Sequence, residues 1–311
     1  MSFVEIAGNP IPEGAQEHWF VGAGGLRLRA LTAPAQGAAR GSILLCPGRT
    51  EFIEKYFEVI TTLAKRGFAV LCLDVRGQGL SDRETDTPVK GHIGNFDDAA
   101  RDLAEAVRLY ADHLPRPHIL MAHSMGGAIS LRALQKEWVR PDAAVFSAPM
   151  WGIASLKGPA LGLTKTMAAI GFGKTFAPGT TKKWERESFE DNNVTHDATR
   201  HARCMDLIEK EPRFALAGPT IGWAAAAANV MDGFQKAGAL SKLRFPILVA
   251  TASEEKLVDN SSHDRVVAAL PEATHITVEG AMHEIMMEKD ALQTPFWTAF
   301  DALADRVAPK K

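Results

Sequence analysis

Two spacings of apolar residues alternate along the first half of the chain. Short, fully apolar runs of the kind found in buried strands recur at 42–46, 68–73, 118–122 and 143–146. Between these runs, apolar residues recur every three or four positions, which predicts helices at 51–66, 97–113 and 125–136. Strands that alternate with helices predict a mostly parallel sheet with helices on its faces.

The pattern changes after Pro149. Residues from about 150 to 240 contain no convincing strand and are rich in Gly, Ala, Met and Trp, with short helical patterns. Strand-like runs return at 246–251 and 275–278, and a closing helix is expected at about 288–307.

We therefore expect one α/β core that is interrupted once. Residues 1–149 and 241–311 form the two parts of the core, and residues 150–240 form a helical cap inserted after the sixth strand. The uncharged stretch at 214–231 is long enough to suggest a membrane span, but Gly218, Pro219 and Gly222 interrupt it. We interpret it as a helix in a region that covers the substrate.

Composition and charge exclude several classes of protein. The chain has 311 residues, of which 46% are hydrophobic, so it can bury a globular core and is not disordered as a whole. Its 35 basic and 37 acidic residues give a net charge of −2, which offers no basic field for nucleic acid. Attraction to a membrane would therefore depend on an apolar surface, and a transient contact with a membrane surface stays open. The oligomeric state is not indicated.

Cysteine usage and the N-terminal sequence bear on the compartment. Cys46, Cys72 and Cys204 are too few and too scattered for a disulfide framework or a CxxC metal site, and the first two lie in apolar runs. We expect Cys46 and Cys72 to be small buried hydrophobic residues, as is usual in a reducing compartment. Residues 1–6 lack a basic region followed by an apolar stretch, so we expect a cytoplasmic protein.

A candidate nucleophile follows the third buried run. Ser124 lies between Ala122 and Gly126, at the end of a strand and directly before a helix. A serine in such a tight strand–turn–helix junction needs small residues two positions before and after it, because the strand and helix approach closely there. Alanine replaces the usual glycine at the first of these positions. The motif predicts that Ser124 is a catalytic nucleophile.

Partners for this serine are expected at the same edge of the sheet, where the carboxyl ends of parallel strands meet. The loop at 48–51 follows the first buried run, and the backbone N–H of Arg49 could act with that of Met125 as an oxyanion hole. His283 follows the last strand-like run and is the candidate general base. The acid should lie between serine and histidine in the chain, where Glu254, Glu255 and Asp259 are all available.

These residues resemble those of the α/β-hydrolases, specifically the branch of bacterial lysophospholipases and monoacylglycerol lipases. The resemblance extends from about residue 17 to 305, is weakest in the insertion, and is carried by the segments 47–51, 74–81, 123–127, 254–260 and 280–284. It implies an α/β-hydrolase fold and a serine hydrolase of carboxylic esters that needs no cofactor. The substrate would be a small-molecule or lipid ester, such as a lysophospholipid or a monoacylglycerol.

The resemblance also bears on the catalytic acid. It places this acid at Glu255, where related lipases carry aspartate, with Asp259 as the alternative. Asp259 is better explained as a cap at the start of the next helix. Two other functions stay open, namely hydrolysis of another bond (C–C, amide or another small ester) on the same fold, and a non-catalytic binding protein.

Several further residues have both a structural and a functional interpretation. Trp151, Trp184 and Trp223 in the insertion are candidates for the substrate surface, although packing explains each one taken singly. We expect His123 to be a packing residue and no histidine to bind a metal. For the side chain of Arg49 we expect solvent or a salt bridge, with contact to a phosphate headgroup as the alternative.

Overall fold

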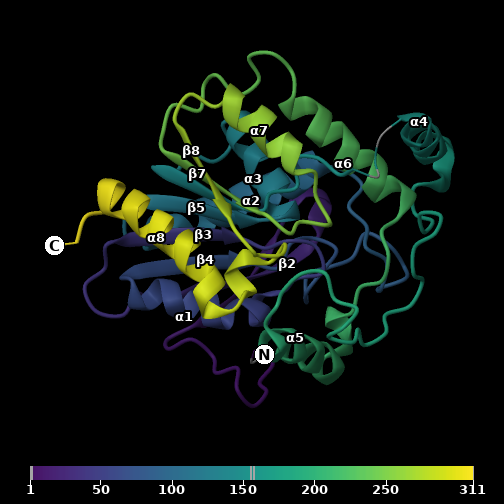
Figure 1. Ribbon diagram of the computed structural model, residues 1–311. Helices are drawn as coiled ribbons and strands as arrows, with labels where there is room; N and C mark the ends of the chain where they lie inside the picture. Colours follow the sequence, from purple (N-terminus) through teal and green to yellow (C-terminus); the bar gives the residue numbers. More distant parts are fainter. Residues whose placement is uncertain (1–2, 155, 157, 311) are drawn as a thin grey trace.

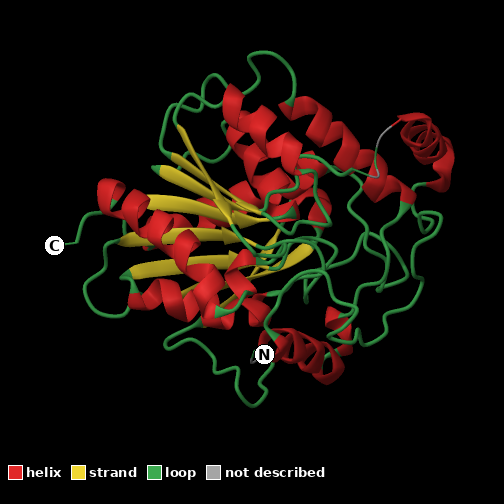
Figure 2. Cartoon of the chain, in the orientation of Figure 1, coloured by secondary structure: helices red, strands yellow, loops and turns green. Residues whose placement is uncertain are grey.

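A single sheet of eight strands forms the centre of the molecule (Figures 1 and 2). The computed structural model describes residues 3–154, 156 and 158–310. The strands are β1 Gln16–Val21, β2 Arg27–Ala33, β3 Gly41–Cys46, β4 Phe68–Leu73, β5 His118–His123, β6 Ala143–Ser147, β7 Ile247–Ala252 and β8 Ala273–Val278. Their order across the sheet is β1-β2-β4-β3-β5-β6-β7-β8.

Strand direction divides the sheet. Strands β4, β3, β5, β6, β7 and β8 are parallel, whereas β1 and β2 join them antiparallel at one edge. This confirms the mostly parallel sheet that the apolar runs predict. The two antiparallel strands had no such run, because polar residues interrupt both of them and β1 lies at the open edge. These polar residues are Gln16, Glu17 and His18 in β1 and Arg27, Arg29 and Thr32 in β2.

Helices cover both faces of the sheet (Figure 2). They are α1 Phe57–Lys65, α2 Phe96–Tyr110, α3 Met125–Gln135, α7 Asn260–Ala269 and α8 Asp290–Val307. A 3₁₀ turn at Ile53–Tyr56 precedes α1, so the helix expected from residue 51 begins later than predicted. The ends of the other three predicted helices lie within a few residues of their expected positions.

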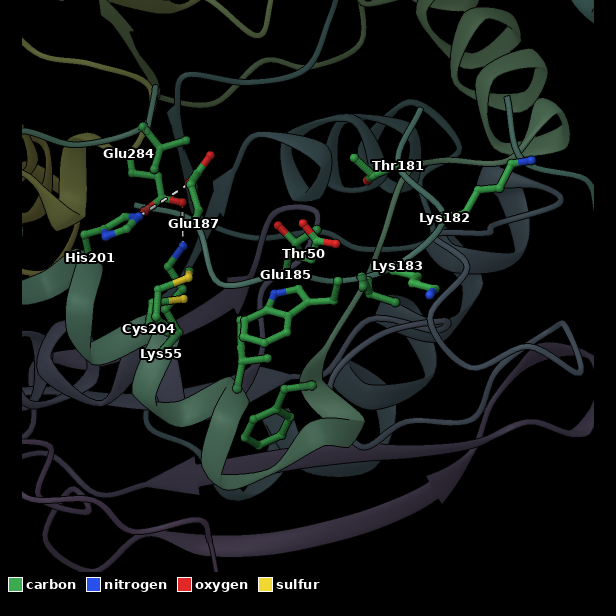
Figure 3. A pocket seen from close by; sticks show the side chains of 16 residues that line it. Thr50, Lys55, Thr181, Lys182, Lys183, Glu185, Glu187, His201, Cys204 and Glu284 are labelled. Carbon is green, nitrogen blue, oxygen red and sulfur yellow. Dashed lines mark hydrogen bonds and ion pairs between the residues drawn. The ribbon is translucent and has the colours of Figure 1, made fainter. Parts of the chain in front are cut away.

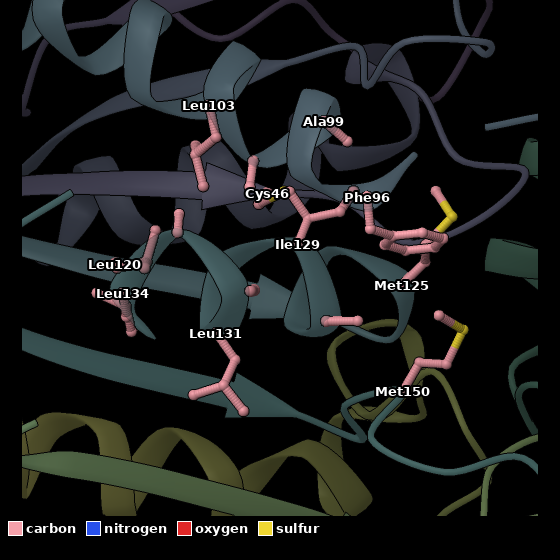
Figure 4. Packing of buried hydrophobic residues seen from close by; sticks show 14 of the residues in the cluster. Cys46, Phe96, Ala99, Leu103, Leu120, Met125, Ile129, Leu131, Leu134 and Met150 are labelled. Carbon is pink, nitrogen blue, oxygen red and sulfur yellow. The ribbon is translucent and has the colours of Figure 1, made fainter. Parts of the chain in front are cut away.

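Alternate residues of each central strand point to opposite faces, as the pleat requires. In β3, Leu44 and Cys46 pack with residues of α2 and α3, whereas Ile43 and Leu45 pack with residues of α1 and α8. Figure 4 shows the first of these clusters, with the side chains of α2 and α3 set against the sheet. All six residues of β3 are buried, which explains its continuous apolar sequence.

The segment between β6 and β7 contains the helices α4 Gly158–Met167, α5 Ala198–Lys210 and α6 Ile221–Phe234, and a π-helical turn at Ala168–Phe172. Among the described residues of 150–240 no strand is longer than an isolated bridge. In Figure 1, α4 lies at the outer edge of the molecule, beside α6 and away from the sheet. Helix α6, in contrast, contacts α2 and α3.

The cysteines and the uncharged stretch at 214–231 have defined places in the fold. Cys46, Cys72 and Cys204 are buried and free, as expected for the first two. The stretch at 214–231 is divided between an extended segment and α6, whose first turn is capped by Thr220. None of the helices in the described part of the chain combines the length and apolar character needed to cross a bilayer.

Candidate active site

Ser124 lies in a strained turn between β5 and α3. Its backbone angles are φ 48° and ψ −119°, a left-handed conformation that few residues other than glycine adopt. Gly126 is required two positions later, because a Cβ there would lie 2.2 Å from the carbonyl oxygen of Cys46. Ala122 fits the other small position and is fully buried. The turn presents the hydroxyl of Ser124 at the carboxyl edge of the sheet.

His283 connects this serine to a carboxylate. Its Nε2 lies 2.8 Å from Oγ of Ser124, and its Nδ1 lies 2.6 Å from Oε2 of Glu255. The three residues come from loops after β5, β7 and β8, so the sheet brings together side chains that are distant in sequence. All three side chains are almost completely enclosed by protein.

The surroundings of Glu255 favour its charged form. Burial by itself raises the pKa of this carboxyl, but the hydrogen bond and charge of His283 and the N–H groups of Leu257 and Val258 outweigh burial and lower it. Asp259, the alternative acid, is instead the N-cap of α7 and accepts a hydrogen bond from the backbone N–H of Ser261. The structure therefore brings Glu255, and not Asp259, to the ring of His283.

Two backbone N–H groups are available beside the serine. The N–H of Arg49 donates to none of the described residues, and Met125 is the first residue of α3, where the N–H has no acceptor within the helix. The loop approaches closely at Gly48, where a Cβ would lie 3.1 Å from Cβ of Ser124. The arrangement can stabilise negative charge on an oxygen next to Ser124.

A serine, a carboxylate and a histidine in this chain order, with a strained turn after a central strand, are characteristic of serine hydrolases with an α/β fold. A family model described as serine aminopeptidase, S33, matches residues 37–290. The chain belongs to this family. Lysophospholipase L2 of Escherichia coli (strain K12) is 34% identical over 275 residues, which cover 85% of this chain and 79% of that protein.

Two further similarities differ in extent. Monoacylglycerol lipase of Mycolicibacterium smegmatis is 32% identical, but over 114 residues that cover 36% of this chain and 39% of that protein. A soluble variant of monoglyceride lipase from Saccharomyces cerevisiae superimposes with a TM-score of 0.74 over 94% of this chain and 96% of that one, at 16% identity. The structural similarity supports the fold of this S33 family member, an α/β-hydrolase.

In this S33 hydrolase, the loop at 48–51, which carries one of the two candidate oxyanion donors, is held by a residue that the sequence did not single out for this role. Gln78 donates from Nε2 to the carbonyl oxygens of Gly48 (2.5 Å) and Glu51 (3.0 Å), and its Oε1 accepts from the N–H of Thr50. Gln78 belongs to the turn at 74–81, one of the segments that carry the family resemblance. The glycine-rich motif of this turn was visible in the sequence, but its contact with the loop at 48–51 was not.

A buried group of charges lies beneath the same loop. Glu51 accepts hydrogen bonds from the N–H of Gly48 and from Tyr56, and Nζ of Lys55 lies 3.0 Å from Glu51 and 2.5 Å from Glu284. Burial alone raises the pKa of Glu51, but Lys55 and the other partners hold it well below its usual value. His123 packs between these charges and His283, and burial lowers its pKa, so it is neutral. This agrees with the packing role we expected for it.

A cavity of about 630 Å³ lies between the insertion and the core (Figure 3). Thr50 and Glu284, which directly follow Arg49 and His283, line its core side, although Ser124 itself does not. The insertion supplies both apolar and charged residues to the cavity wall. The apolar ones are Trp184, Val194, Met205, Ile208, Phe214 and Leu216, and the charged ones are Lys182, Lys183, Glu185 and Glu187 (Figure 3). The volume lies within the usual range for small-molecule sites.

The three tryptophans that were candidates for substrate contact occupy different surroundings. Trp184 lines the cavity. Trp151 is buried in the core, where its indole donates to the carbonyl of Gly127 and packs on Phe146. Trp223 is also buried, and its indole N–H lies 3.4 Å from Sδ of Met125. Only Trp184 of the three reaches the cavity.

The expectation for the side chain of Arg49 was wrong. The guanidinium forms no salt bridge with any described residue and is not in open solvent, since it is partly buried against the insertion. No group of three His, Cys, Asp or Glu side chains in the described ranges is arranged to hold a metal ion.

Proposed function

We propose that this protein hydrolyses the carboxylic ester of a single-chain lipid, with Ser124 as nucleophile, His283 as general base and Glu255 as the acid that orients the histidine. The observation that carries the proposal is the continuous chain of hydrogen bonds from Ser124 through His283 to Glu255, with distances of 2.8 and 2.6 Å. The chain needs no cofactor for this chemistry.

The polarity of the hydrogen bonds gives the direction of proton transfer. The ionised carboxylate of Glu255 can only accept, so Nδ1 of His283 carries the proton and Nε2 has the free lone pair. Nε2 then takes the proton of Ser124 while Oγ attacks the ester carbonyl. His283 returns this proton to the leaving alcohol, and a second cycle with water releases the fatty acid from the acyl-enzyme.

The developing oxyanion is stabilised by the backbone N–H groups of Arg49 and Met125. These donors are fixed before substrate binds, because Met125 begins a helix and Gln78 holds the loop that carries Arg49. Donors that are already oriented need no reorganisation during the reaction, and each contributes roughly 3 kcal/mol or more to transition-state stabilisation.

The substrate class rests on the relatives and on the cavity. The relative from Escherichia coli is named as a lysophospholipase, and it aligns over most of both chains. The apolar residues in the wall of the cavity can contact an acyl chain, and each buried methylene contributes about 0.8 kcal/mol to binding. We infer that a lysophospholipid or monoacylglycerol places its chain along this wall.

Residues 150–240 act as the cap of this site in the proposal. Helix α6 contacts α3, the helix that follows Ser124, and Trp223 of α6 contacts Met125. The insertion also supplies most of the lining of the cavity. A cap in this position excludes water from the acyl chain and selects the substrate by shape.

The outer part of this cap is the proposed point of contact with a lipid surface. Leu163, Ile170 and Phe172 expose 62%, 66% and 49% of their surface, and Lys165 and Lys174 lie close to them in the chain. Apolar side chains flanked by lysine suit the interface of an anionic membrane. The contact would be transient, since the net charge of the whole chain is −2.

Lipid hydrolysis by the purified protein tests the proposal. Wild type and Ser124→Ala are compared on 1-palmitoyl lysophosphatidylcholine, 1-palmitoylglycerol and an aminoacyl p-nitroanilide, with release of fatty acid or nitroaniline as the readout. We expect the wild type to hydrolyse at least one of the two lipid esters, and Ser124→Ala to lose this activity almost completely. Hydrolysis of the anilide alone would show a peptidase and contradict the proposal.

A further inference from the structure

The guanidinium of Arg49 occupies a defined position between the oxyanion loop at 48–51 and the cap. Its Nη2 donates to the carbonyl of Ala217 at 2.6 Å, and its Cζ lies 5.5 Å from the ring centroid of Trp223. Its Nε is enclosed by protein and has no hydrogen-bond partner among the described residues. Nη1 donates to none of these residues either. Four of the five N–H bonds of this cation are therefore not used by the described part of the protein.

Other buried arginines of this protein have carboxylate partners. Arg29 is bonded to Asp74 and Glu54, and Arg76 to Asp102. Arg49 has no ion pair within the described ranges, and burial without a counter-charge lowers its pKa to about 10. A partly desolvated cation without an anion is costly to keep, so the missing partner points to a ligand.

The unpaired cation is close to the reacting groups. The backbone N–H of Arg49 is one of the two proposed oxyanion donors, and Trp223 contacts both its guanidinium and Met125, which supplies the other donor. Thr50, the residue after Arg49, lines the cavity. So does Leu216, the residue before the hydrogen-bonded Ala217. The guanidinium therefore lies between two chain segments whose neighbouring residues line the cavity, and it belongs to the residue that carries one of the proposed oxyanion donors.

We propose that Arg49 binds the phosphate of the substrate and so selects a lysophospholipid with an anionic headgroup over a neutral monoacylglycerol. This inference rests on the proposed function. In a lysophospholipid a glycerol backbone separates the cleaved ester from the phosphate, so a phosphate-binding group is needed close to the nucleophile. The planar fork of arginine matches two phosphate oxygens, and the ring of Trp223 and the carbonyl of Ala217 orient it.

A substrate pair with matched acyl chains tests this role. The kcat/KM for 1-palmitoyl lysophosphatidylglycerol is divided by that for 1-palmitoylglycerol, so that any general loss at the oxyanion loop cancels. We expect Arg49→Gln to lower this ratio about tenfold or more, and Arg49→Lys to lower it less, because lysine keeps the charge but loses the fork. An unchanged ratio in Arg49→Gln would overturn the assignment.

Arg83 provides the matched control. Among the described residues its guanidinium also donates only to backbone carbonyls, those of Gly79, Ser81, Pro88 and Arg213, and burial also lowers its pKa. We expect Arg83→Gln to leave the substrate ratio unchanged, provided that circular dichroism shows it to be folded. A fall in the ratio as large as that in Arg49→Gln would show that the loss of any nearby positive charge lowers the ratio, and would contradict a specific phosphate site at Arg49.

Competition against a water-soluble ester separates this inference from the proposed function. Hydrolysis of p-nitrophenyl butyrate is measured with increasing sn-glycerol 3-phosphate or glycerol. We expect the phosphate compound to inhibit the wild type at least tenfold more strongly than Arg49→Gln, and glycerol to show no such difference. If neither lipid is hydrolysed but this difference is found, the lipid substrate is wrong and the anion site stands. If lipids are hydrolysed without this difference, the anion site is wrong.

Discussion

The turn at Ser124 and the cap at residues 150–240 are held in different ways. Backbone groups fix the serine: its N–H donates to the carbonyl of Ser147, and its own carbonyl accepts from Gly127 and Met150. Side chains fix much of the cap, as in the contact of Trp223 with Met125 and the ion pairs of Arg200 and Arg203 with Glu58.

The part of the molecule proposed to carry out the reaction is therefore held differently from the part proposed to select the substrate. Backbone hydrogen bonds form whatever the side chains are, so the nucleophile keeps its position provided that the small residues Ala122 and Gly126 remain. Contacts between side chains depend on each residue, so substitutions in the cap can change the substrate surface without moving Ser124. We therefore expect large effects from the triad, intermediate effects from the loop beside it and small effects from the outer cap.

Loss of the triad acid should give the largest of the effects predicted in this section. Glu255→Gln leaves the shape nearly unchanged but removes the charge that orients and stabilises the protonated ring of His283, so we expect kcat to fall by about four orders of magnitude. Asp259→Asn is the matched control, because asparagine caps a helix as well as aspartate does. We expect it to change kcat less than about threefold. The reverse order would identify Asp259 as the acid.

An intermediate effect is expected from Gln78, which holds the oxyanion loop by its side chain. Gln78→Leu removes all three of its hydrogen bonds to the loop, so we expect kcat to fall about tenfold to a hundredfold with little change in KM. Gln135→Leu is the control, since Gln135 also donates to a backbone carbonyl but at Gly233 in the cap. Equal kinetics in the two variants would show that the loop does not depend on Gln78.

Stability at mildly acidic pH tests whether the fold depends on the neutral form of His263, which is hydrogen-bonded to the loop after β6. His263 donates to the carbonyl of Pro149, and burial lowers its pKa from 6.5 to about 4. As the pH falls from 6.5 to 4, the unfolded chain takes up this proton before the folded chain does, so stability is lost in this window. The shift corresponds to about 3 kcal/mol for this group.

Urea unfolding of wild type and His263→Gln at pH 6.5 and 4.5 measures this contribution. We expect the wild type to lose about 2 kcal/mol more than the variant between the two pH values. The exposed His113 supplies the control, and His113→Gln should follow the wild type. Parallel losses in wild type and His263→Gln would rule out this histidine as the source.

The smallest effects are expected at the outer edge of the cap. Ile170→Ser replaces an exposed apolar side chain, so we expect the free energy of unfolding to stay within about 0.5 kcal/mol and the hydrolysis of a water-soluble ester to be unchanged. Binding to phosphatidylglycerol vesicles in a sedimentation assay should decrease. Val21→Ser, at an exposed position of β1 away from the cap, should leave vesicle binding unchanged. Equal binding by all three proteins would exclude the proposed contact.

Much of the core and of the site could be predicted from the sequence. Ser124, His283 and the loop at Arg49 each follow a strand, and parallel strands bring their carboxyl ends together, so local patterns were sufficient. The choice of Glu255 over Asp259 needed the family resemblance, because both lie after β7. The geometry at His283 and the cap role of Asp259 in α7 agree with that choice.

What the sequence left open depends on contacts between distant residues. Gln78 meets the oxyanion loop only because β3 and β4 are neighbours in the sheet, and no local pattern shows this. The unpaired guanidinium of Arg49 could not be foreseen either, since it depends on how residues 217–223 fold over the loop. The three cap tryptophans were candidates for the same substrate surface, yet Trp151 and Trp223 are core residues and only Trp184, which is flanked by charged residues in the sequence, lines the cavity.

Covalent labelling tests whether Ser124 is the activated nucleophile of this protein. Wild type and Ser124→Ala are treated with a fluorophosphonate, which reacts with activated serine hydroxyls, and the modified peptide is identified by mass spectrometry. We expect one modification, on Ser124, which is absent from Ser124→Ala and strongly slowed in His283→Ala because Nε2 of His283 activates the hydroxyl. Labelling of another serine, or equal labelling of Ser124→Ala, would contradict this role of Ser124.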